Sequence, residues 1–261
     1  MAIETKDFIG QRAQLYNEIL KEFPLARAQE ISVNMGYFKP LEGEKILEIG
    51  AGSGLYTQVL SDLIGPTGEL VATDPSADQL CNVTALDKPN IRVIQAGADE
   101  LLENPSLVEE KESFDAIWSL GAFHHCMNKS QAFSNFCQLL RANGRLFLCD
   151  VFSGSSLADY FDAEVARYSI TGHEVAFLTQ EFARSLCYLY GFSDPTFHEL
   201  DYEWNFASKE DLGLFMYKIH GMAKTTPEEC LEKVEAFMHI EQKNNGYTLH
   251  VPLTILETYK N

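Results

Sequence analysis

Basic residues, paired cysteines and long apolar runs are all scarce in this chain of 261 residues. Lys and Arg together number 20 against 38 Asp and Glu, which gives a formal net charge of −18. Because proteins that bind nucleic acid neutralise phosphates with Lys and Arg, this balance argues against a DNA or RNA partner. It favours a small-molecule substrate, although it is equally compatible with simple solubility.

The cysteine pattern and the lack of apolar runs limit the compartment and the kind of site. The six cysteines are scattered, and none belongs to a C-x-x-C pair. We therefore expect reduced, mostly buried thiols in a cytoplasmic protein, with no metal site. No apolar run approaches the roughly 20 residues that span a bilayer, and residues 1–7 have no signal-peptide character, so we expect no membrane insertion.

Strand and helix patterns alternate regularly through the first half of the chain, which predicts an α/β fold with a parallel sheet and helices on both faces. The expected strands lie at 45–50, 69–74, 91–95, 114–119 and 144–150, with helices at 54–64, 76–84, 98–103 and 129–141.

The flanking regions have other patterns. Before the sheet, an amphipathic helix is expected to end at Pro24, and a short second helix follows at 26–35. After Asp150, residues 152–178 form a segment too long for a plain connection. A helix at 179–190, a strand at 196–204, two capped helices after Ser208 and Thr226, and a last strand near the C-terminus complete the prediction.

The most informative segment is Glu48–Gly54, with the pattern acidic-x-G-x-G-x-G between an expected strand and helix. Its three glycines let the backbone turn sharply and leave amides open to a ligand. The next strand ends at Asp74, whose carboxylate can accept two ribose hydroxyls. The nicotinamide pattern G-x-G-x-x-G needs a third glycine where this chain has Leu55, so the loop predicts a different nucleotide-like ligand.

The loop, Asp74 and the later strand ends, in this order, resemble the class I S-adenosylmethionine (SAM)-dependent methyltransferases over roughly residues 43–151. Ser119–His125 resembles a segment of small-molecule members of that class, such as the quinone-biosynthesis, type 11 group. The resemblance implies a Rossmann-like seven-stranded, mostly parallel sheet with helices on both faces and an α-helical cap. It also implies that the last strand lies antiparallel beside the fifth and that SAM is the cofactor.

Ligands of open α/β sheets bind at the carboxyl ends of the strands. The resemblance implies that Glu48 approaches the methionine amino group and Asp74 the ribose, while Asp99 meets the adenine. For Asp74 and Asp99 a helix-capping role remains the alternative. The expected cofactor-binding residues are Glu48, Gly50, Ala51, Gly52, Ser53, Gly54, Asp74, Pro75, Gly97, Ala98, Asp99, Ser119 and Leu120.

Methyl transfer from a sulfonium depends mainly on alignment and exclusion of water, and a base helps when the acceptor is a hydroxyl or an ammonium group. His124, His125 and His173 are the candidate bases, with helix capping or packing as the alternative. Aromatic residues after Asp150 favour an apolar or aromatic acceptor. The expected substrate-binding residues are Tyr16, Phe123, Asp150 and Tyr168.

The expected organisation has six parts: an N-terminal helical lid at 1–42, the SAM-binding core at 43–151, a cap insertion at 152–178, a continuation of the core at 179–207, a helical cap insertion at 208–245, and the C-terminal core strand at 246–261. The acceptor atom remains open among oxygen, nitrogen and carbon, and an oligomer is possible. Two alternatives also remain: a non-catalytic SAM-binding regulator or scaffold, and an NAD(P)-dependent oxidoreductase, although no Tyr-x-x-x-Lys pair is present.

Overall fold

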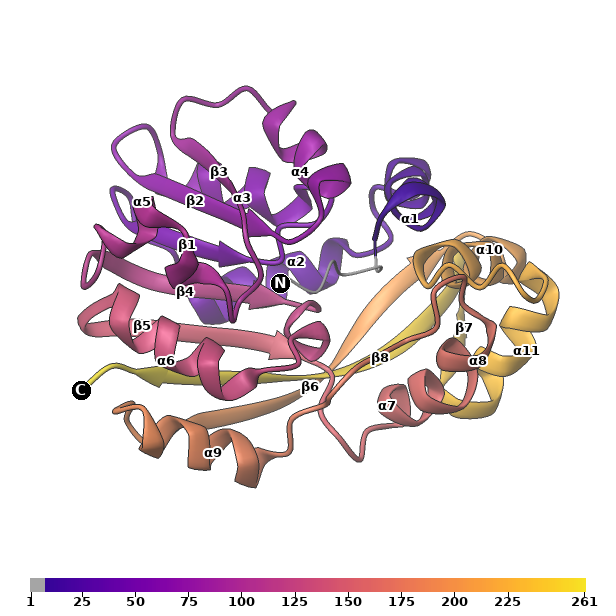
Figure 1. The fold of residues 1–261 in the computed structure, drawn as a ribbon. Coiled ribbons are helices and arrows are strands. Elements are labelled where there is room, and N and C mark those ends of the chain that lie inside the picture. The colour runs from indigo at the N-terminus through magenta and orange to yellow at the C-terminus, as the bar shows by residue number, and fades with distance from the viewer. Residues whose placement is uncertain (1–7) are drawn as a thin grey trace. The chain divides into compact units, whose positions relative to one another are not determined.

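The computed structural model describes residues 8–261, and its fold is drawn in Figure 1. The expectation about a signal peptide concerns residues 1–7 and lies outside the described residues. The chain forms two compact units. The sheet unit contains Phe38–Phe152, Val175–Glu199 and Thr254–Asn261. The helical unit contains the described residues up to Tyr37, together with Ser153–Glu174 and Leu200–Leu253.

The expected Rossmann-like sheet is confirmed. Its parallel strands are β1 (Lys45–Ile49), β2 (Glu69–Asp74), β3 (Ile91–Gln95), β4 (Phe114–Leu120) and β5 (Leu140–Asp150). The order β3-β2-β1-β4-β5 continues with β8 (Gly246–Tyr259) and β6 (Thr196–Phe206). As expected, β8 is antiparallel to β5. A short strand that the sequence did not predict, β7 (Ile240–Lys243), pairs with β8.

Helices of the sheet unit cover both faces of the strands because each strand is apolar on both sides. They are α3 (Leu55–Ile64), α4 (Ala77–Thr84), α5 (Pro105–Val108), α6 (Lys129–Leu139) and α9 (Gln180–Leu189), with short 3₁₀ turns η1 (Leu101–Glu103) and η2 (Phe123–His125). On one face, α6 and α9 pack with Ile117 in a buried apolar cluster (Figure 1). On the other face, the Trp118 ring stacks on Phe147 at 4.9 Å between centroids.

The helical unit contains α1 (Gly10–Glu22), most of α2 (Ala28–Phe38), α7 (Ser156–Tyr160), a π-helical turn (Phe161–Val165), α8 (Ala166–Tyr168), α10 (Lys209–Ile219) and α11 (Pro227–Phe237). Segment 152–178 is thus partly helical. Helices α10 and α11 pack so closely that a Cβ on Gly213 would lie 2.8 Å from the carbonyl oxygen of Pro227. A buried ion pair joins Arg27 to Glu30, which also accepts a hydrogen bond from the indole of Trp204 at 2.8 Å.

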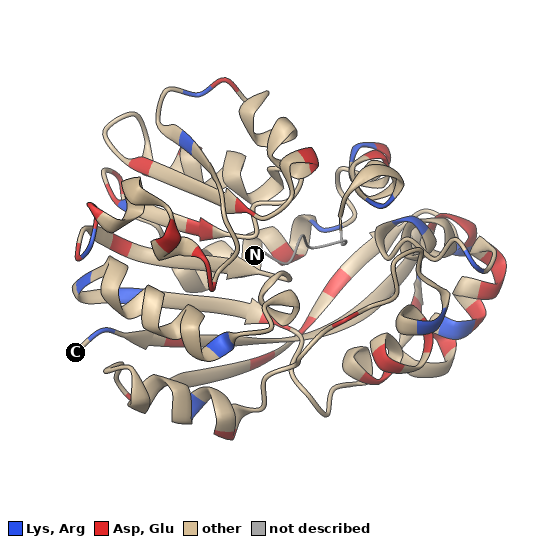
Figure 2. Ribbon diagram, in the orientation of Figure 1, with Lys and Arg blue, Asp and Glu red and all other residues tan. Residues whose placement is uncertain are grey.

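The acidic and basic side chains are interspersed along the fold. Figure 2 shows Asp and Glu on elements of both units, with Lys and Arg between them. In the sheet unit, Lys45 and Arg92 both form ion pairs with Glu69 and with Glu110. Because these two basic side chains are paired with carboxylates, their charge is not available to bind phosphates. Within residues 8–261, no helix combines the length and the apolar character needed to cross a membrane.

Candidate active site

The glycine loop turns between β1 and α3 in a conformation that depends on its glycines. Gly50, Gly52 and Gly54 have φ values of +71°, +54° and +83°, in the left-handed region that residues with a side chain rarely adopt. At Gly50 there is also no room, because an added Cβ would lie 2.2 Å from the Cβ of Ala122. The loop therefore lies directly against the turn that follows β4.

Asp74, at the end of β2, is fixed beside this loop. Its carboxylate accepts hydrogen bonds from the backbone amides of Gly52 at 3.0 Å and Ser76 at 2.8 Å. Ser76, rather than Asp74, is the N-cap of α4 and accepts from the amide of Gln79. Burial raises the pKa of Asp74 to about 6, although both amide hydrogen bonds act in the opposite direction. The structure therefore gives the capping role to Ser76 and leaves Asp74 as a buried carboxyl at the loop.

Glu48 is a second buried carboxyl, on β1 before the loop, and only 2% of it is exposed. The hydroxyl of Thr57 on α3 donates to its carboxylate at 2.6 Å. The pKa of Glu48 is raised to about 7: burial is the largest cause, the negative charge of Asp74 adds to it, and the Thr57 hydrogen bond opposes both. A buried carboxyl with a raised pKa can bind a cationic ligand favourably, because a nearby positive charge stabilises the ionised carboxylate.

The loop after β3 is held in place by a residue that the sequence did not single out. The side-chain amide of Asn135, on α6, donates to the carbonyls of Ala98 at 3.1 Å and Asp99 at 3.0 Å. Asn135 is fully buried, and its only sequence signal is a polar residue on the apolar face of α6. Asp99 and Glu100 stand directly before η1, with Glu100 as its N-cap, and the role of Asp99 at the adenine stays a prediction.

The other expected cofactor residues lie at neighbouring strand ends. The hydroxyl of Ser119, near the end of β4, donates to the carbonyl of Ile49 on β1 at 3.0 Å. The amide of Ala51 donates to the carbonyl of Thr73 at 2.9 Å. Pro75 is exposed, and its carbonyl accepts from Gln95 at 3.0 Å. Ser53, Gly97 and Leu120 are half-buried.

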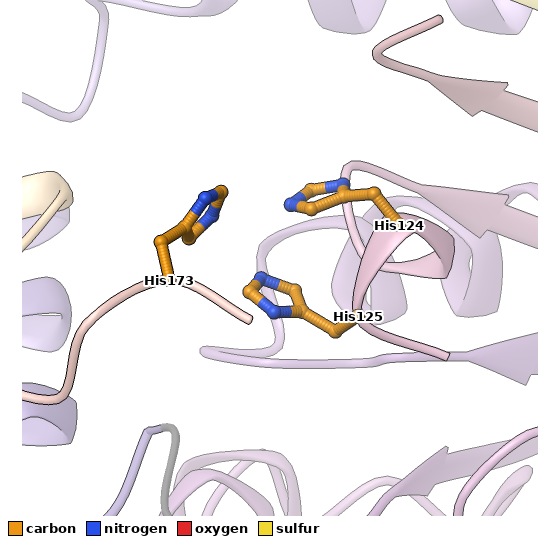
Figure 3. Close-up of side chains that lie close together, drawn as sticks. All are labelled: His124, His125 and His173. Atoms are coloured by element: carbon orange, nitrogen blue, oxygen red, sulfur yellow. The ribbon is translucent and has the colours of Figure 1, made fainter. Parts of the chain in front are cut away.

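Two candidate bases lie side by side in η2, after β4. Figure 3 shows His124 and His125 extending from this turn, and their ring centroids are 4.2 Å apart. The Nδ1 atom of His124 lies 2.5 Å from Oδ1 of Asp150, at the end of β5, and its backbone amide donates to Oδ2 at 2.9 Å. The amide of Val151 donates to Oδ1 at 2.7 Å.

This pairing controls the charge of Asp150 and the tautomer of His124. Burial alone would raise the pKa of Asp150, but His124 and the two backbone amides lower it below its ordinary value. The ionised carboxylate accepts the Nδ1 proton, so a neutral His124 ring carries its lone pair at Nε2. The carboxylate of Asp150 thus accepts its hydrogen bonds from His124 and Val151, which belong to the protein itself.

Two further residues hold the η2 turn. Phe123, an expected substrate contact, is 1% exposed and packs against Phe133 and Phe136 at 5.9 and 5.8 Å between ring centroids, which favours a role in the core. Lys129 donates to the carbonyls of Phe123 at 3.1 Å and Cys126 at 2.7 Å. Burial lowers the pKa of Lys129. The sequence did not single out Lys129, because no local pattern marks a lysine at the start of a helix as buried.

Three expected residues belong to the helical unit. Tyr16, on α1, meets Phe8 edge-on at 5.3 Å between ring centroids. The Tyr168 ring lies 4.3 Å from the ammonium of Lys233. His173 meets Phe161 edge-on at 4.8 Å. Their predicted roles at the acceptor or over the cofactor remain predictions.

Comparison with known proteins finds a family match within the sheet unit. Residues 47–146 match the family model described as a methyltransferase domain. The chain is 30% identical over 128 residues to the ubiquinone/menaquinone biosynthesis C-methyltransferase UbiE of Pseudomonas aeruginosa, covering 46% of this chain and 48% of that protein. It is 21% identical over 231 residues to the mitochondrial ubiquinone biosynthesis O-methyltransferase of Dictyostelium discoideum, covering 81% of this chain and 67% of that protein.

The fold is also that of solved methyltransferases. The structure of Haemonchus contortus phosphoethanolamine N-methyltransferase 2 in complex with S-adenosyl-L-methionine matches with a TM-score of 0.60 at 14% identity, covering 95% of this chain and 56% of that chain. The chain spans about half the length of the first curated relatives that it matches. Residues 47–146 are therefore a methyltransferase domain, and the fold around them is the Rossmann-like fold of solved methyltransferases.

Proposed function

We propose that the protein transfers a methyl group from SAM to an oxygen, nitrogen or carbon nucleophile of a small apolar or aromatic molecule. One observation carries this proposal: two buried carboxyls with raised pKa values, Glu48 and Asp74, border a glycine loop that has no room for a side chain at Gly50. A ligand with a cationic end and a pair of hydroxyls suits both carboxyls at once.

The residues of the sheet unit fit SAM. When bound, SAM supplies a methyl group on a positively charged sulphur, which leaves readily as a neutral thioether. Glu48 would accept the ammonium of its methionine part, and Asp74 would accept the ribose hydroxyls beside the amide of Gly52. The loop Gly97–Asp99, fixed by Asn135, would meet the adenine.

His124 is the proposed general base. With its Nδ1 proton held by Asp150, the neutral ring can accept a proton from the acceptor hydroxyl or ammonium at Nε2. Asp150 then acts as the group that orients the ring and stabilises the imidazolium, by the same logic as the acid of a catalytic triad. His125 and His173 remain alternative bases, and Tyr16 and Tyr168 remain proposed acceptor contacts, whereas Phe123 and Asp150 are proposed to support the η2 turn and the His124 ring.

The relatives support a small-molecule acceptor without fixing its atom. Their names describe a C-methyltransferase and an O-methyltransferase of quinone biosynthesis. The net charge of −18 adds support for a small molecule over a nucleic acid. The six cysteines are free thiols, which supports the proposed cytoplasmic location.

The test measures transfer of a radioactive methyl group from SAM to a panel of quinols, catechols and amines. Product formed with one class, and lost in Asp74→Ala together with SAM binding, is the expected result. SAM binding by wild type with no product from any acceptor would favour the non-catalytic SAM-binding alternative. Binding of NADH in place of SAM would instead favour the oxidoreductase.

A further inference from the structure

Gln79, in the first turn of α4, has a buried side-chain amide without hydrogen-bond partners among the described residues. Only 1% of the residue is exposed. Among the described residues, neither its Oε1 nor its Nε2 has a hydrogen-bond partner. An amide with one acceptor and two donors is costly to bury in this state, so native proteins nearly always satisfy it. A ligand that forms hydrogen bonds with this amide would remove the free-energy cost of burying it unpaired.

The first turn of α4, which carries Gln79, lies close to the glycine loop. Val83, one helical turn later on the same face, approaches the glycine loop, and its Cγ2 would lie 3.5 Å from a Cβ built on Gly54. Helical side chains lean toward the N-terminus, and the N-terminal end of α4 is the end at which Asp74 bonds to Ser76. The turn of α4 that carries Gln79 is thus joined through Ser76 to Asp74, and Asp74 is bonded to the glycine loop.

We infer that Gln79 is a specificity residue that binds the ribose hydroxyls of SAM together with Asp74; this inference rests on the proposed function. An ionised carboxylate can only accept hydrogen bonds. Ribose hydroxyls that donate to Asp74 keep acceptor lone pairs, and the Nε2 of Gln79 supplies the donor that Asp74 lacks. Its Oε1 can accept from a hydroxyl as well. The amide therefore selects a ligand with intact hydroxyls over one that lacks them.

The experiment compares wild type, Gln79→Met and the control Gln58→Met, which changes an exposed glutamine on α3. Calorimetry measures binding of S-adenosylhomocysteine and of its 2′,3′-dideoxy analogue, and thermal unfolding is followed without ligand. We expect Gln79→Met to weaken S-adenosylhomocysteine roughly tenfold, the effect of one hydrogen bond, and to leave the dideoxy analogue unchanged. Ligand-free Gln79→Met should unfold at a higher temperature than wild type, because an unpaired buried amide is removed.

Three outcomes would overturn the inference. Equal binding of S-adenosylhomocysteine by wild type and Gln79→Met would show that Gln79 makes no contact with the ligand, although the ligand still binds. An equal loss for both ligands would mean that the amide contacts another part of the ligand. A ligand-free Gln79→Met that unfolds at a lower temperature, or fails to fold, would give Gln79 a structural role. Failure of wild type to bind S-adenosylhomocysteine would instead overturn the proposed function itself.

Discussion

His124 and Asp150 are joined twice, through the imidazole Nδ1 at 2.5 Å and through the backbone amide of His124 at 2.9 Å, each to a different oxygen of one carboxylate. Both residues are buried, with exposures of 6% and 3%. The double contact fixes both the ring and the turn that carries it, so the imidazole is held at the carboxyl ends of β4 and β5 in one orientation.

Replacement of His124 by Gln should lower kcat by about 10²–10⁴-fold, the usual contribution of a general base. The dissociation constant of SAM should stay within about twofold, because His124 has no proposed contact with the cofactor. Steady-state kinetics and calorimetry measure the two effects. His125→Gln is the matched control in the neighbouring position. If His125→Gln were the variant that lost turnover, the two histidines would exchange roles.

Glu48 should make the ligand-free protein less stable as the pH rises from 4.5 to 7. Its pKa is about 7 in the folded protein against an ordinary 4.5, so over this range the folded state binds more protons than the unfolded state. The free energy of unfolding therefore falls with pH, by about 3 kcal/mol in total for this group. Above pH 7 the carboxyl is ionised in both states and the loss is complete.

Urea unfolding of wild type and Glu48→Gln at several pH values measures this dependence. The difference between the two proteins should grow between pH 4.5 and 7 and then stay constant, with the variant more stable at pH 8. A difference that does not change with pH would mean that Glu48 has the same pKa in the folded and unfolded states. Thr57→Val is a useful companion, because loss of the hydroxyl donor should raise the pKa of Glu48 further.

Gly50→Ala should destabilise the protein by about 2–5 kcal/mol, since a positive φ and an overlap with Ala122 both oppose it. Gly121→Ala is the matched control: its φ is +61°, but an added Cβ has nothing within 4 Å. That variant should lose only about 1–2 kcal/mol. Adding Ala122→Gly to Gly50→Ala should restore part of the loss. Thermal unfolding of the four proteins measures these differences, and equal losses at Gly50 and Gly121 would contradict the steric argument.

Asn135→Leu should cost about 1–3 kcal/mol of stability, because it leaves the carbonyls of Ala98 and Asp99 without their donor. It should also weaken binding of SAM, since the loop proposed to meet the adenine loses its anchor. Gln131→Leu, which removes a hydrogen bond to Asn135 and keeps the two carbonyls paired, serves as the control. Urea unfolding and calorimetry separate the two effects. Unchanged binding of SAM by Asn135→Leu would contradict the proposed contact between this loop and the cofactor.

Much of the sheet follows from the sequence, because strand and helix spacing are local properties. The strands at 69–74 and 91–95 have the predicted bounds. The strand β7 (Ile240–Lys243) escaped prediction since its single apolar residue gives no alternation, and it forms only because the turn before Gly246 brings it back along β8. The segment 152–178 likewise carried too little periodicity to predict its helices.

The amino-acid sequence by itself determined the βαβ order, the glycine loop and the acidic residues at the strand ends, since each depends on neighbours within a few positions. Only the tertiary structure decided that Asp150 bonds to His124, 26 residues away, and that Asn135 fixes the loop Gly97–Asp99. It alone buried Glu48 and left the Gln79 amide unpaired. These features depend on strand register and on exclusion of water, which arise when distant segments pack together and which no local pattern records.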